Sequence, residues 1–261
     1  MRVALSSLTL QVDRIEATRL GGFWQQMNLH SPYWRLYCHQ GAGARAHGRD
    51  RSISFKPNRV YLVPPFAGLM GQVDPTGREL VRQFHIHFQL EAAAEPVANA
   101  IHWFDPGRDL LTQIWQCAGL HRDEQDQREL LGITILLHTL SRVIAGTTQE
   151  ERPASQDPRI VLASRFMSQH LQHAPAIDQV AEECSLSTSG LVRLFKREIG
   201  TTPWKYFNRL RMERACELLV DTELGIDDIA ESLGYPDRFQ FSRSFKRIMH
   251  QSPVAWRRSP P

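Results

Sequence analysis

The stretch IDDIAESLGYPDRFQFSRSFKR, residues 226–247, holds two short segments of helical character separated by a turn. In the second segment, Phe241 and Phe245 lie four residues apart and share one face of a helix, while Arg243 and Arg247 share another. The letters LGYPD between the segments contain a glycine, which suits a left-handed turn, and a proline, which cannot continue a helix. The stretch predicts a helix, a tight turn and a second helix with one buried and one basic face.

A second copy of this pattern precedes the first. Residues 177–207 share with residues 226–256 an Ile-Asp pair, an Ala-Glu pair, a Phe-Lys-Arg triplet and a proline after Thr or Ser, in the same order. Two copies are too few for a solenoid, so we interpret them as a duplicated helix-turn-helix unit. Ser187 and Asp237 are the expected N-caps of the two second helices. Residues 204–220 lack Gly and Pro and predict a connecting helix about 26 Å long.

The second helix of each unit has the composition of a DNA-reading helix. A helix fits the major groove, where Arg and Lys hold phosphates and Arg also grips guanine. The alternative for the basic residues is a solvated face, which a single copy of the pattern would not exclude. Phe239 could contact a thymine methyl, and its alternative role is packing within the protein. We expect Leu191, Leu194, Phe195, Phe241, Phe245 and Ile248 to face inward. The expected DNA-binding residues are Ser189, Arg193, Lys196, Arg197, Arg238, Phe239, Ser242, Arg243 and Lys246.

The remainder of the chain divides by its patterning. Residues 1–95 alternate apolar and polar residues between Gly and Pro, which predicts short strands in a small barrel or jelly roll. From Pro96 helical patterns take over, and residues 96–145 are expected to form a helical dimerisation segment. The polar residues 146–158 read as a linker, and residues 159–261 as the DNA-binding domain. The fold class is therefore α+β.

A heptad-like seam runs through residues 126–145. Its members are spaced 3, 4, 3 and 4 residues apart, as in a coiled coil. We expect this seam to pair with a second copy of the chain; the alternative is a helix that packs on the core of its own domain. The seam consists of Leu130, Ile133, Leu137, Leu140 and Ile144.

Composition narrows the class of protein. The sequence contains no run of 18 apolar residues, so no membrane-spanning helix is expected. The N-terminus does not resemble a secretory signal. Four widely spaced cysteines suit a reducing cytoplasm. Of the 31 basic and 28 acidic residues, 16 and 16 lie in residues 1–158, so the net charge of +3 belongs to the last hundred residues.

Residues 159–258 resemble the DNA-binding domain of AraC/XylS-type bacterial transcriptional regulators. The residues that carry the resemblance are Ile229-Ala230, Gly234-Tyr235, Asp237, Phe241 to Arg247, Ser252-Pro253 and Trp256-Arg257, with Val180-Ala181, Leu194 to Lys196, Gly200 and Thr202-Pro203 in the first unit. His250 departs from the glycine usual in the family, and Gly190 should loosen the first reading helix by up to about 1 kcal/mol.

The resemblance implies a cupin-like sensor in residues 1–95 that is cytoplasmic and responds to a small-molecule effector. In VRQFHIHF, residues 81–88, alternate side chains share a face, so two histidines point the same way. Cupin metal sites add an acid and a further His, which are not evident here, so neither a metal nor a cofactor is expected. The expected effector-binding residues are Trp34, Tyr37, His39, Gln83, His85 and His87.

These observations predict a sequence-specific DNA-binding transcriptional regulator, a homodimer that by resemblance contacts RNA polymerase. The alternative is a regulator of the same fold whose N-terminal domain binds no small molecule and only dimerises or contacts another protein. A cupin enzyme with an attached DNA-binding domain is disfavoured, because no complete metal set or nucleophile–base pair is visible.

Overall fold

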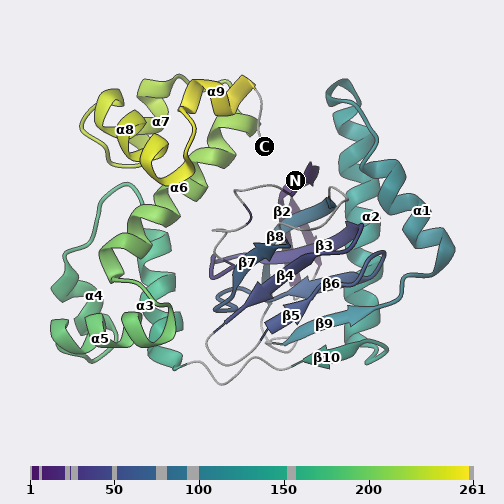
Figure 1. The fold of residues 1–261 in the computed structure, drawn as a ribbon, viewed down its shortest axis with the longest axis horizontal. Helices are drawn as coiled ribbons and strands as arrows, with labels where there is room; N and C mark the ends of the chain where they lie inside the picture. Colours follow the sequence, from purple (N-terminus) through teal and green to yellow (C-terminus); the bar gives the residue numbers. More distant parts are fainter. Residues whose placement is uncertain are drawn as a thin grey trace. The chain divides into compact units, whose positions relative to one another are not determined.

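The computed structural model describes residues 2–5, 8–20, 24, 29–48, 52–74, 81–92, 100–151 and 157–258 (Figure 1). The chain forms two compact units, Met1–Ala154 and Ser155–Pro261. The first consists of antiparallel sheets with two helices and the second is helical, so the predicted α+β class is confirmed.

The N-terminal unit contains a seven-stranded and a three-stranded antiparallel sheet. The order in the larger sheet is β1-β2-β8-β3-β6-β9-β10, and in the smaller sheet β5-β4-β7. The strands are β1 (Arg2–Leu5), β2 (Leu8–Arg19), β3 (Trp34–Gln40), β4 (Ala44–His47), β5 (Ser52–Ser54), β6 (Val60–Val63), β7 (Met70–Val73), β8 (Arg82–Ala92), β9 (Ile101–Phe104) and β10 (Gln149–Glu151).

Each face of the larger sheet borders a separate core. Two helices, α1 (Gly107–Cys117) and α2 (Gln125–Ile144), cover one face, where Leu36 and Ile86 are buried. The other face points toward the smaller sheet, where Tyr37 packs in the second core. Because side chains alternate along a strand, β3 and β8 each contribute to both cores.

The segment between the sheet and the second unit differs from expectation. The prediction that helices take over from Pro96 was wrong for residues 101–104, because β9 pairs with β6 inside the larger sheet. The stretch expected to be only a linker contains β10, in which Gln149 pairs with Trp103 of β9. Three polar residues suffice for such an edge strand, since its backbone amides and carbonyls supply the bonds.

The second unit consists of two helix-turn-helix motifs (Figure 1). Its helices are α3 (Pro158–Gln169), α4 (Ile177–Glu183), α5 (Thr188–Glu198), α6 (Pro203–Asp221), α7 (Ile226–Ser232), α8 (Arg238–Met249) and α9 (Pro253–Arg258). Both predicted N-caps are confirmed: the Ser187 hydroxyl accepts from the Gly190 amide at 3.2 Å, and the Asp237 carboxylate accepts from the Gln240 amide at 2.7 Å.

Each helix-turn-helix motif has two residues in the left-handed backbone region. After the first helix of each motif, Ser185 has φ 53° and Gly234 has φ 69°; after the second, Gly200 has φ 77° and His250 has φ 60°. Glycine adopts this region without a Cβ penalty, whereas other residues lose about 1–2 kcal/mol there. Each motif therefore contains one relaxed and one strained turn.

We expect His250→Gly to raise the free energy of unfolding of the second unit by about 0.5–1 kcal/mol, because relief of the left-handed strain outweighs the added freedom of the unfolded chain. Gly200→Ala is the matched control at the equivalent turn, where nothing lies within 4 Å of the added Cβ. It should lower stability by about 1 kcal/mol through the backbone alone. Urea unfolding measures both; stabilisation by Gly200→Ala would contradict the backbone explanation.

Candidate DNA-binding surface and effector site

The second helix of each motif buries one apolar face. Leu191, Leu194 and Phe195 of α5 lie in one core, and Phe241 and Phe245 of α8 lie in another. The predicted inward faces are confirmed at these five positions, and Ile248 is partly buried. The opposite faces of α5 and α8 point to solvent.

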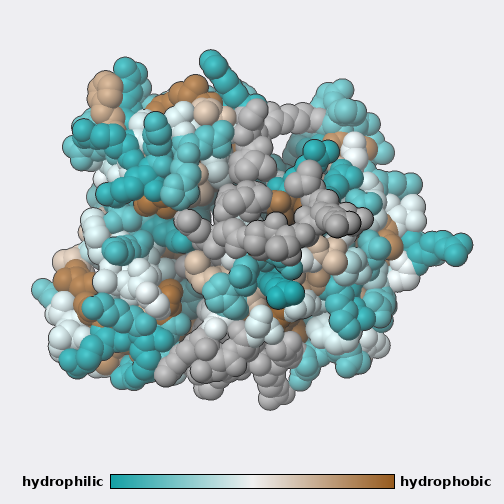
Figure 2. Space-filling model, in the orientation of Figure 1, coloured by the Kyte–Doolittle hydropathy of each residue, from teal (hydrophilic) through white to brown (hydrophobic). Residues whose placement is uncertain are grey.

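The residues expected to bind DNA lie on these outer faces. Ser242 is partly buried, whereas Phe239 is 65% exposed, an unusual position for a large aromatic ring. The face shown in Figure 2 is largely hydrophilic over the helices of this unit, with small apolar patches. The exposed members of the expected set are Ser189, Arg193, Lys196, Arg197, Arg238, Phe239, Arg243 and Lys246.

Two of the basic residues are held by neighbouring carboxylates. Arg197 pairs with Glu198 at 2.6 Å and with Asp157 at 3.2 Å. Arg238 lies 3.5 Å from Asp227, and its guanidinium stands 5.0 Å from the Phe239 ring centroid. Exposed ion pairs of this kind are weak, so DNA phosphates can displace them.

The other four basic residues of the set, Arg193, Lys196, Arg243 and Lys246, form no ion pair within the described part of the chain. They occupy corresponding places on the two helices. Each arginine lies two residues before the buried Phe195 or Phe245, and each lysine directly follows it. The two helices therefore present the same basic pattern.

The second candidate site is a polar ladder across β2, β8 and β3. Three directly paired sets cross the sheet: Arg14, His87 and Arg35; Glu16, His85 and Tyr37; Thr18, Gln83 and His39. Paired residues of antiparallel strands point to the same face, so the ladder lines the region between the two sheets. Arg35 was not among the predicted site residues. It lies two residues before Tyr37 on β3 and therefore points to the same face as Tyr37 and His39, so the alternation along the strand could have identified it.

The ladder histidines are buried and sparsely hydrogen-bonded. Gln83 Nε2 lies 2.9 Å from His39 Nε2, while Glu16 Oε2 lies 3.9 Å from His85 Nε2, too far for a hydrogen bond. The Nδ1 atoms of His39, His85 and His87 have no hydrogen-bond partner in the described residues. Three buried imidazoles with an unused nitrogen are uncommon, since buried polar groups are normally satisfied.

Burial dominates the titration of these side chains. It lowers the pKa of His39 and His85 from 6.5 to about 3, and nearby Arg14 and Arg35 act in the same direction on His85. Burial also lowers the pKa of His87 well below its usual value. The ladder imidazoles are therefore neutral at pH 7, as hydrogen-bonding groups and not as charges.

Trp34 does not belong to this site, and its prediction as an effector-binding residue was wrong. It stacks on Phe88, with ring centroids 6.3 Å apart, in the core beneath α1 and α2. The physical reason is the two-residue period of β3, which directs Trp34 to the opposite face from Tyr37 and His39. Trp24, 5.7 Å from the Tyr37 ring, takes a place in the core between the sheets.

The predicted dimer seam is divided by α2. Ile133 and Leu140 are buried in the core of their own chain at 7% and 4% exposure, so the prediction that they face a second chain was wrong. Leu130, Leu137 and Ile144 are 64%, 40% and 59% exposed. These three lie seven residues apart and form an apolar stripe, which we call the α2 stripe.

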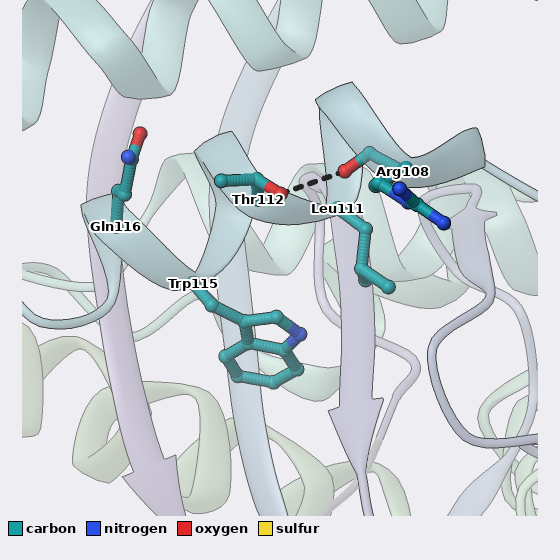
Figure 3. Close-up of a pocket in the computed structure, with 5 residues that line it drawn as sticks. All are labelled: Arg108, Leu111, Thr112, Trp115 and Gln116. Carbon is teal, nitrogen blue, oxygen red and sulfur yellow. Dashed lines mark hydrogen bonds between the residues drawn. The ribbon is translucent and has the colours of Figure 1, made fainter.

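An open groove of about 460 Å³ lies along α1. Figure 3 shows Trp115 and Leu111 beside Thr112, whose hydroxyl donates to the Arg108 carbonyl at 2.8 Å. Among the described residues no group of three or more His, Cys, Asp or Glu is arranged to hold a metal ion. None of the helices in the described ranges is long and apolar enough to span a membrane.

Two helix-turn-helix motifs with matched basic faces define the class of DNA-binding helix-turn-helix proteins. A family model described as a helix-turn-helix domain matches residues 180–259. The transcriptional activator RhaS of Escherichia coli O139:H28 is 32% identical over 146 residues, which cover 56% of this chain and 51% of RhaS. The matched C-terminal segment is similar to AraC/XylS-type transcriptional regulators, so the predicted resemblance is confirmed.

Solved structures match the fold over nearly all of this chain. Fatty-acid-bound ToxT from Vibrio cholerae matches with a TM-score of 0.54 and 11% identity, over 98% of this chain and 97% of ToxT. ToxT from Vibrio cholerae O395 matches with a TM-score of 0.53 and 11% identity, over 97% and 98%. At this identity the likeness concerns the fold alone. The chain spans about half the length of the curated relatives that it matches in sequence.

Proposed function

We propose that the protein is a transcriptional regulator that inserts α5 and α8 into successive major grooves of double-stranded DNA. The observation that carries the proposal is the repetition of one exposed basic pattern opposite one buried aromatic face, fifty residues apart. Arg193 and Arg243 would contact base edges, and Lys196 and Lys246 would contact phosphates. RhaS is a transcriptional activator, and we propose that this protein also activates transcription and contacts RNA polymerase.

We further propose that the polar ladder binds a small-molecule effector. Its support is the set of buried Nδ1 atoms on His39, His85 and His87, which an uncharged ligand with hydroxyl or carbonyl groups would satisfy. Tyr37 and Gln83 line the same face. ToxT, of the same fold, is described as binding an unsaturated fatty acid, which supports a ligand-binding role for this type of chain.

The proposed homodimer forms through the α2 stripe. Leu130, Leu137 and Ile144 recur at the heptad interval, and Thr134 and Ser141 lie between them on the same exposed side. An isologous pairing of two such stripes would cover three large apolar side chains on each copy. A dimer would present four reading helices to the DNA. No catalytic step is proposed.

A binding titration tests the DNA-reading proposal. The full chain would first select a duplex from a random 30-base-pair library, and a scrambled duplex of the same composition would serve as the reference. Arg243→Ala should weaken binding to the selected duplex by about 1–3 kcal/mol and relax the preference at one base position. Arg193→Ala should have a smaller effect, because Gly190 lies in the first turn of α5.

Lys246→Ala distinguishes a phosphate contact from a base contact. It should weaken both duplexes equally and reduce the slope of affinity against salt concentration. Arg214→Ala, on the exposed face of α6 and paired with Glu217 at 2.8 Å, is the control and should leave affinity unchanged. Equal losses on both duplexes for Arg243→Ala would assign Arg243 to phosphate contact and contradict its base-reading role.

A further inference from the structure

The helix α6 connects two separate cores, and one arginine lies where they meet. Tyr206 and Leu210 belong to the core of the first motif, and Met212 and Ala215 belong to the core of the second. Arg211 lies between these two sets and is only 5% exposed. A buried arginine is rare, because removing its charge from water is costly unless its environment compensates.

The Arg211 side chain contacts both motifs. Its Nε donates a hydrogen bond of 2.8 Å to the carbonyl of Leu171, in the loop after α3. Its guanidinium lies 4.5 Å from the ring centroid of Phe207 on α6 and 5.4 Å from that of Tyr235 in the turn after α7. A planar guanidinium suits this position, since it donates at its edge and stacks with its faces.

The same loop and turn approach one another directly. A Cβ added to Gly234 would lie 1.8 Å from the carbonyl oxygen of Gln172 and 2.7 Å from Arg211 Nη2. The turn of the second motif is therefore packed against the backbone of the first. The approach at Gly234 is so close that only glycine, which has no Cβ, fits there. Leu171 packs against both cores and closes the junction.

The contacts between the loop and the turn restrain the two motifs in a different way from α6. A helix fixes the distance between two motifs along its axis, but each motif can still tilt on the part of the helix that it packs against. A contact between the α3–α4 loop and the α7–α8 turn, away from the helix axis, restrains that tilt. Arg211 contacts the loop, the helix and the turn at once.

We infer that Arg211 is a positioning residue that holds the two motifs in one orientation and thereby sets the spacing between the two half-sites that the chain accepts on DNA. The inference rests on the proposed DNA-reading function. One base pair changes the separation of two half-sites by about 3.4 Å and rotates one by roughly 34–36° about the duplex axis. A rigid pair of motifs cannot follow that change, whereas a loosened pair can.

The test uses the full chain and the duplex that it selects from the random library. In a second set of duplexes one base pair is inserted or removed between the two half-sites, and in a third one half-site is scrambled. For the unmodified chain the change of spacing should lower affinity about tenfold. Arg211→Met, which retains the length of the stem but not the hydrogen bond, should reduce that penalty to about threefold or less. Its affinity for the duplex with a single intact half-site should equal that of the unmodified chain.

Arg214→Met, three residues further along α6 and exposed, is the matched control and should keep the full spacing penalty. If Arg211→Met lacks the helical circular dichroism of the unmodified chain, Arg211→Lys replaces it, since an ammonium group retains the charge but not the stacking. An unchanged spacing penalty in the folded Arg211 variant would overturn this inference and leave the DNA-reading function intact. Failure of the unmodified chain to select any duplex would overturn both.

Discussion

Leu140→Glu is expected to unfold the N-terminal unit, whereas Leu137→Glu, on the same helix, is expected to leave it folded. Leu140 is 4% exposed and lies in the core between α2 and the larger sheet, so its replacement leaves an unpaired carboxylate among apolar side chains. The loss in the free energy of unfolding should be about 4 kcal/mol, comparable to the stability of many whole domains. Leu137 is 40% exposed, and a surface change should alter stability by about 0.5 kcal/mol or less.

Self-association should respond in the opposite order. Leu137→Glu places a charge in the middle of the α2 stripe, where two copies would bring like charges together, and should convert dimer to monomer. Thermal unfolding by circular dichroism measures the first effect, and sedimentation measures the second. A folded, dissociated Leu140→Glu variant beside an unaffected Leu137→Glu variant would show that the buried face of α2 had been assigned to the wrong partner.

Acidification from pH 7.5 to 5.5 is expected to lower the free energy of unfolding of the N-terminal unit by about 4 kcal/mol. Burial lowers the pKa of His30, His39 and His85 to about 3 in the folded chain, against about 6.5 when unfolded. Their contribution is fully present above pH 6.5 and is lost as the unfolded chain gains protons between 6.5 and 3. Between pH 7.5 and 5.5 each of these three histidines accounts for about 1.4 kcal/mol, which together makes about 4 kcal/mol. His87 adds a further loss in the same direction.

Single variants separate the ladder from other acid effects. His39→Gln removes one buried titrating group and should reduce the pH dependence by about 1.4 kcal/mol. His47→Gln is the control, because His47 is exposed on β4. Denaturant unfolding of each variant at the two pH values gives the comparison. The histidines of the second unit, His170, His173 and His250, are exposed, in contrast to the buried histidines of the ladder. Equal pH dependence in the His39→Gln variant and the unmodified chain would show that this imidazole is not buried neutral.

The second unit was largely predictable because its signals are local. The apolar spacing of Leu191, Leu194 and Phe195, and of Phe241 and Phe245, identifies one face of each helix directly, since a helix places residues three and four apart together. The N-caps Ser187 and Asp237 are recognised from hydrogen bonds that span three residues. The pattern occurs twice, and two copies exclude the solvated basic face that a single copy would also fit.

The N-terminal unit was predictable in its alternation but not in the details of its pairing. The alternation along β8 correctly grouped Gln83, His85 and His87, yet Trp34 was assigned to the same site although its parity on β3 differs from that of Tyr37. The heptad spacing on α2 combined residues of two different faces of the helix into one seam. Only the packing of α2 on the sheet separates buried Ile133 and Leu140 from the exposed positions, because burial depends on which surface a helix meets.

The sequence alone therefore determined the two helix-turn-helix motifs, their basic faces and the resemblance to AraC/XylS-type regulators. These follow from interactions within about ten residues, which periodicity and capping record. The tertiary structure alone decided that Arg211 is buried at the meeting of two cores, that Gly234 touches the backbone at Gln172, and that three polar sets cross the larger sheet. Such contacts join segments that lie far apart along the chain, and no local pattern in a chain encodes which distant surfaces will meet.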